Sequence, residues 1–205
     1  MNDLYLYDSE LRKQYPILRG ADEAGRGPLC GPVCCAAVVL KSDFECDEIN
    51  DSKKISEKKR EKLFDIIIEN ALSYSIVMVS PDEIDRINIL NASLEGMKQA
   101  TENLSVKPDL LLVDGNKVPK NTDFPVESLV KGDSTSMSIA AASILAKVSR
   151  DRYMEELDKQ YPQYQLAKHK GYPTKSHYEL IEKYGVQDFY RMSFFKNRPE
   201  LWVKK

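Results

Sequence analysis

Apolar and polar residues alternate in short blocks along this chain, and the blocks predict strands followed by helices. Apolar runs predict strands over residues 17–23, 32–40, 72–80 and 109–113, and a fifth strand is expected over 126–131. The chain contains no internal repeat, no low-complexity tract and no long linker. The pattern therefore predicts an α/β or α+β domain.

Helix starts are marked by capping residues. Ser56 precedes an amphipathic stretch, and residues 80–83 (SPDE) have the capping-box order, with proline at the first helical position. A longer helix is expected over 89–104 and a last one over 175–184. Between them, residues from about 134 to 151 carry small and aliphatic side chains nearly all round, which predicts a helix buried inside the protein.

Composition limits the class of protein. With 205 residues, 42% of them hydrophobic and 30% charged, the chain has the size and balance of one globular domain. No apolar run approaches the roughly 18 residues that span a bilayer, and the polar N-terminus lacks a secretory pattern. We therefore expect a cytoplasmic protein.

Four cysteines lie in one short segment, at positions 30, 34, 35 and 46. On a strand the neighbours Cys34 and Cys35 point to opposite faces, which suits neither a disulfide framework nor a zinc ribbon. Buried, reduced thiols are the favoured interpretation, ahead of a metal or redox role.

The net charge of -2 hides an uneven distribution. From residue 159 onward the chain has ten Lys and Arg against four Asp and Glu, whereas the preceding residues have 20 against 28. Such asymmetry suits a protein in which one part attracts phosphates and another holds cations. An ordinary surface with uneven charge explains it equally well.

Carboxylates recur where the predicted strands and loops break. Asp22 and Glu23 precede a glycine-rich connector, Asp114 ends an apolar strand, and Asp133 lies between a glycine and a helix start. Grouped carboxylates are the ligands that Mg²⁺ and Mn²⁺ prefer, and two cations about 3.5 to 4 Å apart can promote phosphodiester cleavage. Taken singly, Asp114 is better explained as a turn residue and Asp133 as a helix cap.

Two geometric arguments refine this set. Asp22 and Glu23 face opposite sides of a regular strand, so we expect the strand to end or kink beside Gly25 if both serve one site. Asp133 and Asp151 would be about 27 Å apart on one unbroken helix. They cannot share a metal pair, and Asp133 is the better candidate.

Other segments have weaker signals. The turn at Gly25, Arg26 and Gly27 lets a backbone approach a ligand closely, but its spacing fits neither a nucleoside-triphosphate loop nor a dinucleotide motif. The basic segments 52–54 and 168–170 are either solvated charge or phosphate contacts. Neither of the two histidines has an obvious nucleophile beside it, which disfavours an acyl-transfer triad.

Six segments taken together are similar to the ribonuclease HII family, the bacterial type 2 ribonucleases H. They occur in the family's order and span nearly the whole chain, so the resemblance is specific. The segments are 20–33 (GADEAGRGPLCGPV), 51–54 (DSKK), 112–116 (LVDGN), 131–133 (KGD), 141–151 (AASILAKVSRD) and 169–174 (HKGYPT).

The resemblance implies an α/β ribonuclease H-like fold, with a mixed central sheet flanked by helices and a helical C-terminal extension. It implies a single domain over 1–205, with a catalytic core over about 16–158 and a basic helical part over about 159–205. The implied activity cuts the RNA strand of RNA–DNA hybrids and nicks duplex DNA 5′ to embedded ribonucleotides, leaving 3′-hydroxyl and 5′-phosphate ends. Such an enzyme removes ribonucleotides from DNA during replication and repair.

The resemblance also assigns roles to residues. The carboxylates would hold Mn²⁺ or Mg²⁺, two ions during catalysis, and the Gly-Arg-Gly turn would read the ribose 2′-hydroxyl. The ring of Tyr172 would pack on the deoxyribose after the RNA-to-DNA junction, and Lys53 would contact a phosphate. The residues implied as metal-binding and catalytic are Asp22, Glu23, Asp114 and Asp133, and those of the turn are Gly25, Arg26 and Gly27.

Three alternatives bear on this identification. The sibling family ribonuclease HIII usually has an extra N-terminal domain, and here about 16 residues precede the first strand, which favours HII. A noncatalytic hybrid-binding subunit would not need all four carboxylates. Residues 187–195 resemble a sliding-clamp peptide with the phenylalanine pair one residue out of step, so packing is favoured over a clamp contact. We expect a monomer.

Overall fold

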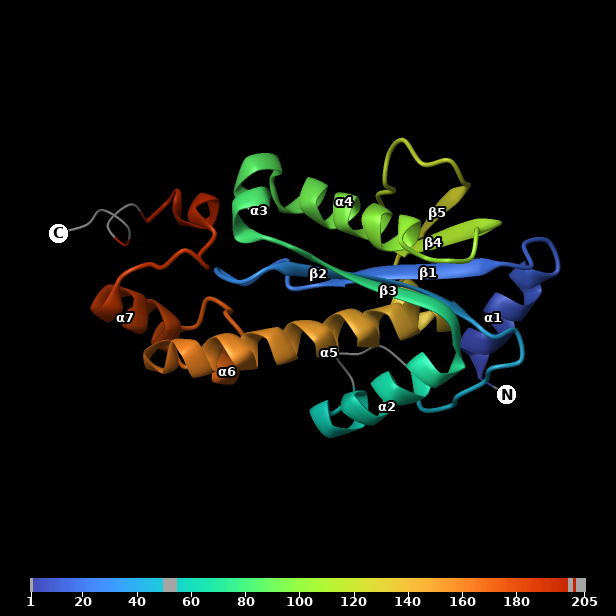
Figure 1. The fold of residues 1–205 in the computed structure, drawn as a ribbon, viewed down its shortest axis with the longest axis horizontal. Helices are drawn as coiled ribbons and strands as arrows, with labels where there is room; N and C mark the ends of the chain where they lie inside the picture. Colours follow the sequence, from blue (N-terminus) through green and yellow to red (C-terminus); the bar gives the residue numbers. More distant parts are fainter. Residues whose placement is uncertain (1, 50–54, 199–200, 202–205) are drawn as a thin grey trace.

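The computed structural model describes residues 2–49, 55–198 and 201. Its centre is a sheet with the strand order β3-β2-β1-β4-β5 (Figure 1). The first three strands in the chain pair antiparallel, whereas β1 pairs parallel with β4, and β4 with β5, so the sheet is mixed as expected. The strands are β1 Leu18–Ala24, β2 Val33–Leu40, β3 Ala71–Val79, β4 Leu110–Asp114 and β5 Val126–Leu129.

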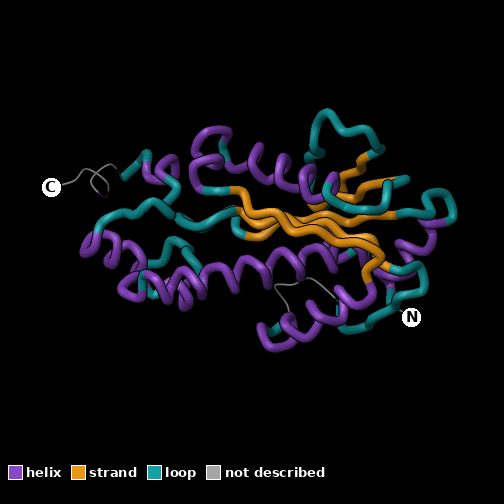
Figure 2. The backbone as a smooth tube through the Cα atoms, viewed as in Figure 1, coloured by secondary structure: helices purple, strands orange, loops and turns teal. Residues whose placement is uncertain are grey.

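Helices cover both faces of the sheet (Figure 2). Figure 1 shows α5 (Met137–Gln160) and α2 (Glu57–Asn70) on one face, with α3 (Pro81–Ile87) and α4 (Ile89–Glu102) on the other. Side chains of β2 alternate between the two layers, as expected for a strand. Cys34 packs in the core beside α2 and α5, and Cys35 packs in the core beside α4. Every residue of β2 is buried, which explains its continuous apolar run.

Helix α5 lies directly against β1. A Cβ atom at Gly20 would lie 2.1 Å from the backbone carbon of Ser138, so only glycine permits this approach. The N-terminus of α5 is capped by Ser136, whose hydroxyl accepts from the amide of Ile139. Asp8, on the helix α1 (Asp3–Arg12), adds a second cap by accepting from the amide and hydroxyl of Ser138.

The C-terminal part packs around the last turns of α5. It contains α6 (Leu166–His169) and α7 (Lys175–Tyr184), which surround a third core with Tyr164 at its centre. Of the phenylalanine pair in the clamp-like segment, Phe195 is buried there, at 1% exposure, and Phe194 is half-buried against the same core, which fits a packing role. Short 3-10 turns occur at Gly132–Ser134, Pro162–Tyr164 and Met192–Phe195.

Most predicted elements lie within a few residues of their observed bounds. The sequence pattern predicts neither α1 nor the short helix α6. Only Leu4 and Asp8 of α1 are buried, so α1 lacks a clear apolar stripe. Strand β5 ends at Leu129, two residues early, and α5 begins only at Met137. Within the described residues, no helix has both the length and the apolar character to cross a membrane.

The cysteines are free thiols, as expected. Three of them are buried, and burial raises the pKa of Cys30 and of Cys34 to about 12, which keeps both protonated and unreactive. Cys46 is only half-buried, so the expectation of burial fails there, because it lies in a loop outside the sheet.

Candidate active site

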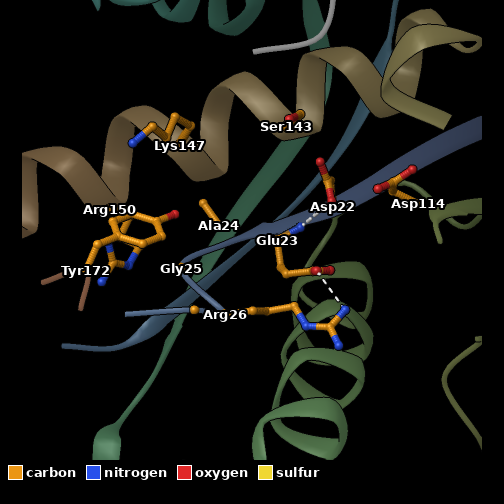
Figure 3. Close-up of a pocket in the computed structure, with 11 residues that line it drawn as sticks. Asp22, Glu23, Ala24, Gly25, Arg26, Asp114, Ser143, Lys147, Arg150 and Tyr172 are labelled. Atoms are coloured by element: carbon orange, nitrogen blue, oxygen red, sulfur yellow. Dashed lines mark hydrogen bonds and ion pairs between the residues drawn. The ribbon is translucent and has the colours of Figure 1, made fainter. Parts of the chain in front are cut away.

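A pocket opens where β1 and β4 end beneath α5 (Figure 3). It brings together seven of the residues predicted from the sequence, which come from β1, the turn after it, β4 and the loop before α7. These are Asp22, Glu23, Gly25, Arg26, Gly27, Asp114 and Tyr172. Lys53 lies outside the described residues.

Strand register explains why Asp22 and Asp114 meet. Ala21 is the last residue of β1 paired with β4, and its partner is Val113. The next residue of each parallel strand is an aspartate, so the two carboxylates leave the sheet at the same edge. Figure 3 shows Asp22 and Asp114 side by side there.

Strand β1 runs through Asp22 and Glu23 and ends at Ala24, directly before Gly25, as expected. Pairing with β2 continues through Ala24, opposite Cys34. Glu23 therefore faces the other side of the strand, toward Arg26, whose Nη1 lies 3.4 Å from its Oε1 (Figure 3). Both carboxylates line one pocket, in the part of β1 that extends past its last pairing with β4.

Three carboxylates crowd together around Asp22. Burial, and then repulsion from Glu23 and Asp114, raise the pKa of Asp22 well above its usual range. The amide of Glu23 and the hydroxyl of Ser143 oppose this rise by hydrogen bonding to the carboxylate. A divalent cation would offset such crowding, so the donor set fits one.

Asp133 lies beside this group but does not line the pocket. It is 6% exposed, in the turn before α5, and the amide of its neighbour Gly132 donates to Oδ1 of Asp114 at 2.7 Å. Asp151 lies far along α5, paired with Lys147 at 2.7 Å and Arg60 at 3.8 Å. The described residues contain no ready-formed cluster of three acidic, histidine or cysteine side chains for a metal ion.

The Gly-Arg-Gly turn packs against buried side chains. Gly25 has φ of +96°, and a Cβ atom there would lie 1.9 Å from Nε of Arg150, so glycine is required on both counts. At Gly27 a Cβ atom would be 3.5 Å from the ring of Tyr172. The turn and the tyrosine are therefore neighbours across the pocket.

Tyr172 is 44% exposed, and its backbone is held by hydrogen bonds to His169 and His177. Nδ1 of His177 lies 2.9 Å from the carbonyl oxygen of Tyr172, so this nitrogen must carry the proton. Nε2 of His177 then accepts from the hydroxyl of Tyr190 at 3.0 Å, and His169 stacks on His177 at 4.0 Å between ring centroids. Burial is the main reason that the pKa of His177 is lowered to about 4.

Sequence reasoning missed three polar residues of the pocket: Ser143, Lys147 and Arg150. A signal existed, because they recur at intervals of four and three residues and so share one face of α5. Part of the positive charge of the basic segment 168–170 is neutralised, because Nζ of Lys170 lies 2.5 Å from Oε1 of Glu155. His169 is bonded to Tyr164 through its Nε2.

The fold has clear counterparts among solved structures. The ribonuclease H2 from Pyrococcus horikoshii superposes with a TM-score of 0.77 at 29% identity, covering 90% of this chain and 96% of that one. The ribonuclease HII of the PCNA:RNase HII complex from Archaeoglobus fulgidus gives a TM-score of 0.70 at 28% identity, covering 86% and 94%. Fold and pocket together define a ribonuclease H, a hydrolase that cleaves RNA internally.

Sequence comparison narrows the class. The family model for ribonuclease HII matches residues 19–197. A ribonuclease HII from Caldicellulosiruptor bescii is 52% identical over 187 residues, which cover 91% of this chain and 90% of the relative. The chain belongs to the ribonuclease HII family.

Proposed function

We propose that this chain is a metal-dependent endonuclease that cuts the RNA strand of RNA–DNA hybrids and nicks duplex DNA 5′ to an embedded ribonucleotide. The products would have 3′-hydroxyl and 5′-phosphate ends. The observation that carries the proposal is the meeting of Asp22 and Asp114 at the ends of parallel strands, beside a glycine turn and a half-exposed tyrosine. No nucleophilic side chain is needed for this chemistry.

We assign the cation site to Asp22, Glu23, Asp114 and Asp133. When bound, one or two Mg²⁺ or Mn²⁺ ions would supply an activated water and stabilise the departing 3′ oxygen. Such ions often keep several waters and are held by few carboxylates together with substrate phosphates. An incomplete protein cluster is therefore the arrangement expected before substrate binds.

Substrate recognition falls to the other residues of the pocket. The turn of Gly25, Arg26 and Gly27 would bond to the ribose 2′-hydroxyl, the group that distinguishes RNA from DNA. Tyr172 would pack its exposed ring on the adjacent deoxyribose. The assignment of Lys53 to a phosphate contact stays a prediction.

The remaining sequence-based expectations are proposals of the same kind. They are a role in removing ribonucleotides from DNA in replication and repair, a cytoplasmic location, a monomeric state and a single domain over 1–205. A clamp contact through residues 187–195 has less support, because Phe195 is buried in the C-terminal core and Phe194 is half-buried against it. A partner could reach Phe195 only after local unfolding.

The test is cleavage of three labelled duplexes of one sequence: all DNA, DNA with a single ribonucleotide, and an RNA–DNA hybrid. We expect cleavage of the last two only, and only with Mg²⁺ or Mn²⁺. Asp133→Ala should abolish it, whereas Asp8→Ala, the same change at a buried aspartate that does not line the pocket, should retain cleavage in whatever fraction folds. Binding without cleavage would favour a noncatalytic hybrid-binding subunit.

A further inference from the structure

The chain near its C-terminus returns to the turn that follows β1. Tyr190 forms an isolated antiparallel bridge with Cys30. On either side of that bridge, the amide of Arg191 donates to the carbonyl of Leu29 at 2.9 Å, and the amide of Gly31 donates to that of Phe189 at 2.8 Å. Residues 189–191 thus act as a short backbone partner for the loop that carries the Gly-Arg-Gly turn.

The side chain of Arg191 makes this contact specific. It is fully buried, and its guanidinium donates to three carbonyl oxygens of one loop. Nε reaches Gly31 at 2.9 Å, Nη1 reaches Arg26 at 3.2 Å, and Nη2 reaches Gly25 at 2.8 Å. Three bonds from one planar group fix the relative orientation of three peptide units.

No ion pair of the described residues includes Arg191; the carboxylate of Asp85, bonded to the amides of Met192 and Ser193, acts on its charge only from a longer distance. Its guanidinium lies 5.2 Å from the ring centroid of Phe194, which adds a weak attraction. Burying a charge in this way is costly, and an apolar side chain would fill the space more cheaply. What the guanidinium adds is the three directed bonds to the loop.

Those bonds determine where the amides of the turn point. All peptide bonds of the described residues are trans, and in a trans peptide the N–H points opposite to the C=O. The carbonyls of Gly25 and Arg26 point to Arg191, so the amides of Arg26 and Gly27 point away from it. The turn lines the pocket whereas Arg191 does not, so Arg191 holds the turn from outside the pocket.

We propose that Arg191 is a positioning residue that aims the backbone amides of Arg26 and Gly27 at the substrate, and so sets the preference for a ribonucleotide over a deoxyribonucleotide. The inference rests on the proposed function for its consequence, the ribose preference. The fixed orientation of the two amides follows from the contacts of Arg191 alone and does not depend on the proposed function. Charge-assisted bonds to the carbonyls also polarise the peptide units, which strengthens their N–H groups as donors.

The test compares Arg191→Gln and Arg191→Lys with the wild type, using the full chain. The first readout is affinity for all-DNA duplex and for the same duplex with one ribonucleotide, both without divalent cations so that nothing is cut. We expect the ratio of the two affinities to fall by about fivefold to tenfold in Arg191→Gln, the loss of one hydrogen bond. Arg191→Lys, which keeps the charge but not the fork, should lie between.

The second readout is independent of substrate. Backbone ¹⁵N order parameters of Arg26 and Gly27 should fall from about 0.85 toward 0.6 in the variants. The matched control is Arg19→Lys, since Arg19 is also buried and donates to a backbone carbonyl, that of Thr101, at the far end of β1. It should leave both readouts unchanged.

Three results separate the possibilities. A folded Arg191 variant with wild-type affinity ratio and order parameters would overturn the proposal, and so would equal losses for both duplexes, which indicate a merely structural role. If the wild type itself shows no ribonucleotide preference, ribose reading by the turn is wrong, and the order parameters still decide whether Arg191 holds it. If Arg191→Gln does not fold, Arg191→Lys gives both readouts.

Discussion

Asp114 has two roles that a substitution can separate: its side chain accepts a hydrogen bond, and it carries a negative charge. Its Oδ1 accepts from the amide of Gly132, and its negative charge raises the pKa of the neighbouring Asp22. An asparagine keeps the acceptor oxygen but not the charge. The fold needs the hydrogen bond from Gly132, and the proposed cation site needs the negative charge.

Asp114→Asn should therefore keep the fold and lose the reaction. We expect the free energy of unfolding to change by no more than about 1 kcal/mol and cleavage to fall at least about 100-fold. Denaturant unfolding and cleavage of a duplex with one ribonucleotide measure the two effects. Near-normal turnover in a folded variant would remove Asp114 from the site.

The ring and the backbone of Tyr172 can also be tested separately. The side chain is half-exposed, whereas the backbone carbonyl is bonded to His177. Removing the ring in Tyr172→Ala leaves the backbone contact in place. Cleavage at a single ribonucleotide should fall about tenfold or more through lost contact with the sugar, with duplex affinity much less affected. Tyr172→Phe is the control and should stay close to wild type, whereas equal losses of cleavage and binding would contradict the assigned role.

The four carboxylates, the glycine turn and Tyr172 could be predicted individually, because each stands at a break in a local pattern or in a specific motif. The sequence indicated that Asp22 and Asp114 belong to one group of carboxylates. It could not show that they lie side by side, because strand register decides which residues of β1 and β4 are neighbours. Arg191 could not be predicted at all. Its bonds cross 165 and 166 residues of sequence to Arg26 and Gly25, and no local pattern records such a contact.

At the scale of elements, the contact between β1 and α5 positions the site. It sets Asp22 of β1 opposite Ser143 of α5, and it depends on the missing side chain of Gly20. Sequence patterns predicted both elements, and the small residues of α5 indicated burial. The patterns could not say which strand the helix would contact, because that choice is made by tertiary packing.

Gly20→Ala should destabilise the whole chain, because its methyl group would overlap the backbone of Ser138. Overpacking of this kind costs about 1 to 3 kcal/mol, and backbone cannot rotate away as a side chain can, so we expect the upper end or more. Chemical denaturation gives the value. Gly27→Ala is the matched control, with its nearest contact at 3.5 Å, and a similar loss in both variants would refute the packing argument.

At the scale of the molecule, the C-terminal part completes the pocket rather than standing apart from the core. It supplies Tyr172, the histidines beneath it and Arg191 behind the turn. The boundary expected near residue 158 falls inside α5, which runs on to Gln160 and so joins the two parts. Much of the positive charge expected to attract phosphates is exposed, but Arg191 is not part of it.

This arrangement makes stability depend on pH through His177. Its pKa is about 4 in the folded chain against 6.5 for an ordinary histidine, so between these values the unfolded chain binds more protons. Stability should fall as pH drops from about 6.5 toward 4, by up to about 1.4 kcal/mol per pH unit from this residue. Urea unfolding at pH 7.5 and 5.5 measures the change.

The comparison that isolates this residue is His177→Gln, which cannot titrate. The variant should be less stable than wild type at pH 7.5 but should lose less on acidification. His169, whose pKa is also lowered by burial, would continue to contribute in both proteins. An identical pH dependence in the two proteins would show that His177 is not the cause.

The most direct test of the account is to map the cut in a duplex that carries one ribonucleotide, with each strand labelled in turn and Mg²⁺ or Mn²⁺ present. We predict one cut, on the ribonucleotide strand and on its 5′ side, leaving a 3′-hydroxyl and a 5′-phosphate, and none in Asp22→Asn. A cut elsewhere, different ends, or an active Asp22→Asn protein would contradict the claim that the carboxylates of β1 and β4 form the reaction centre.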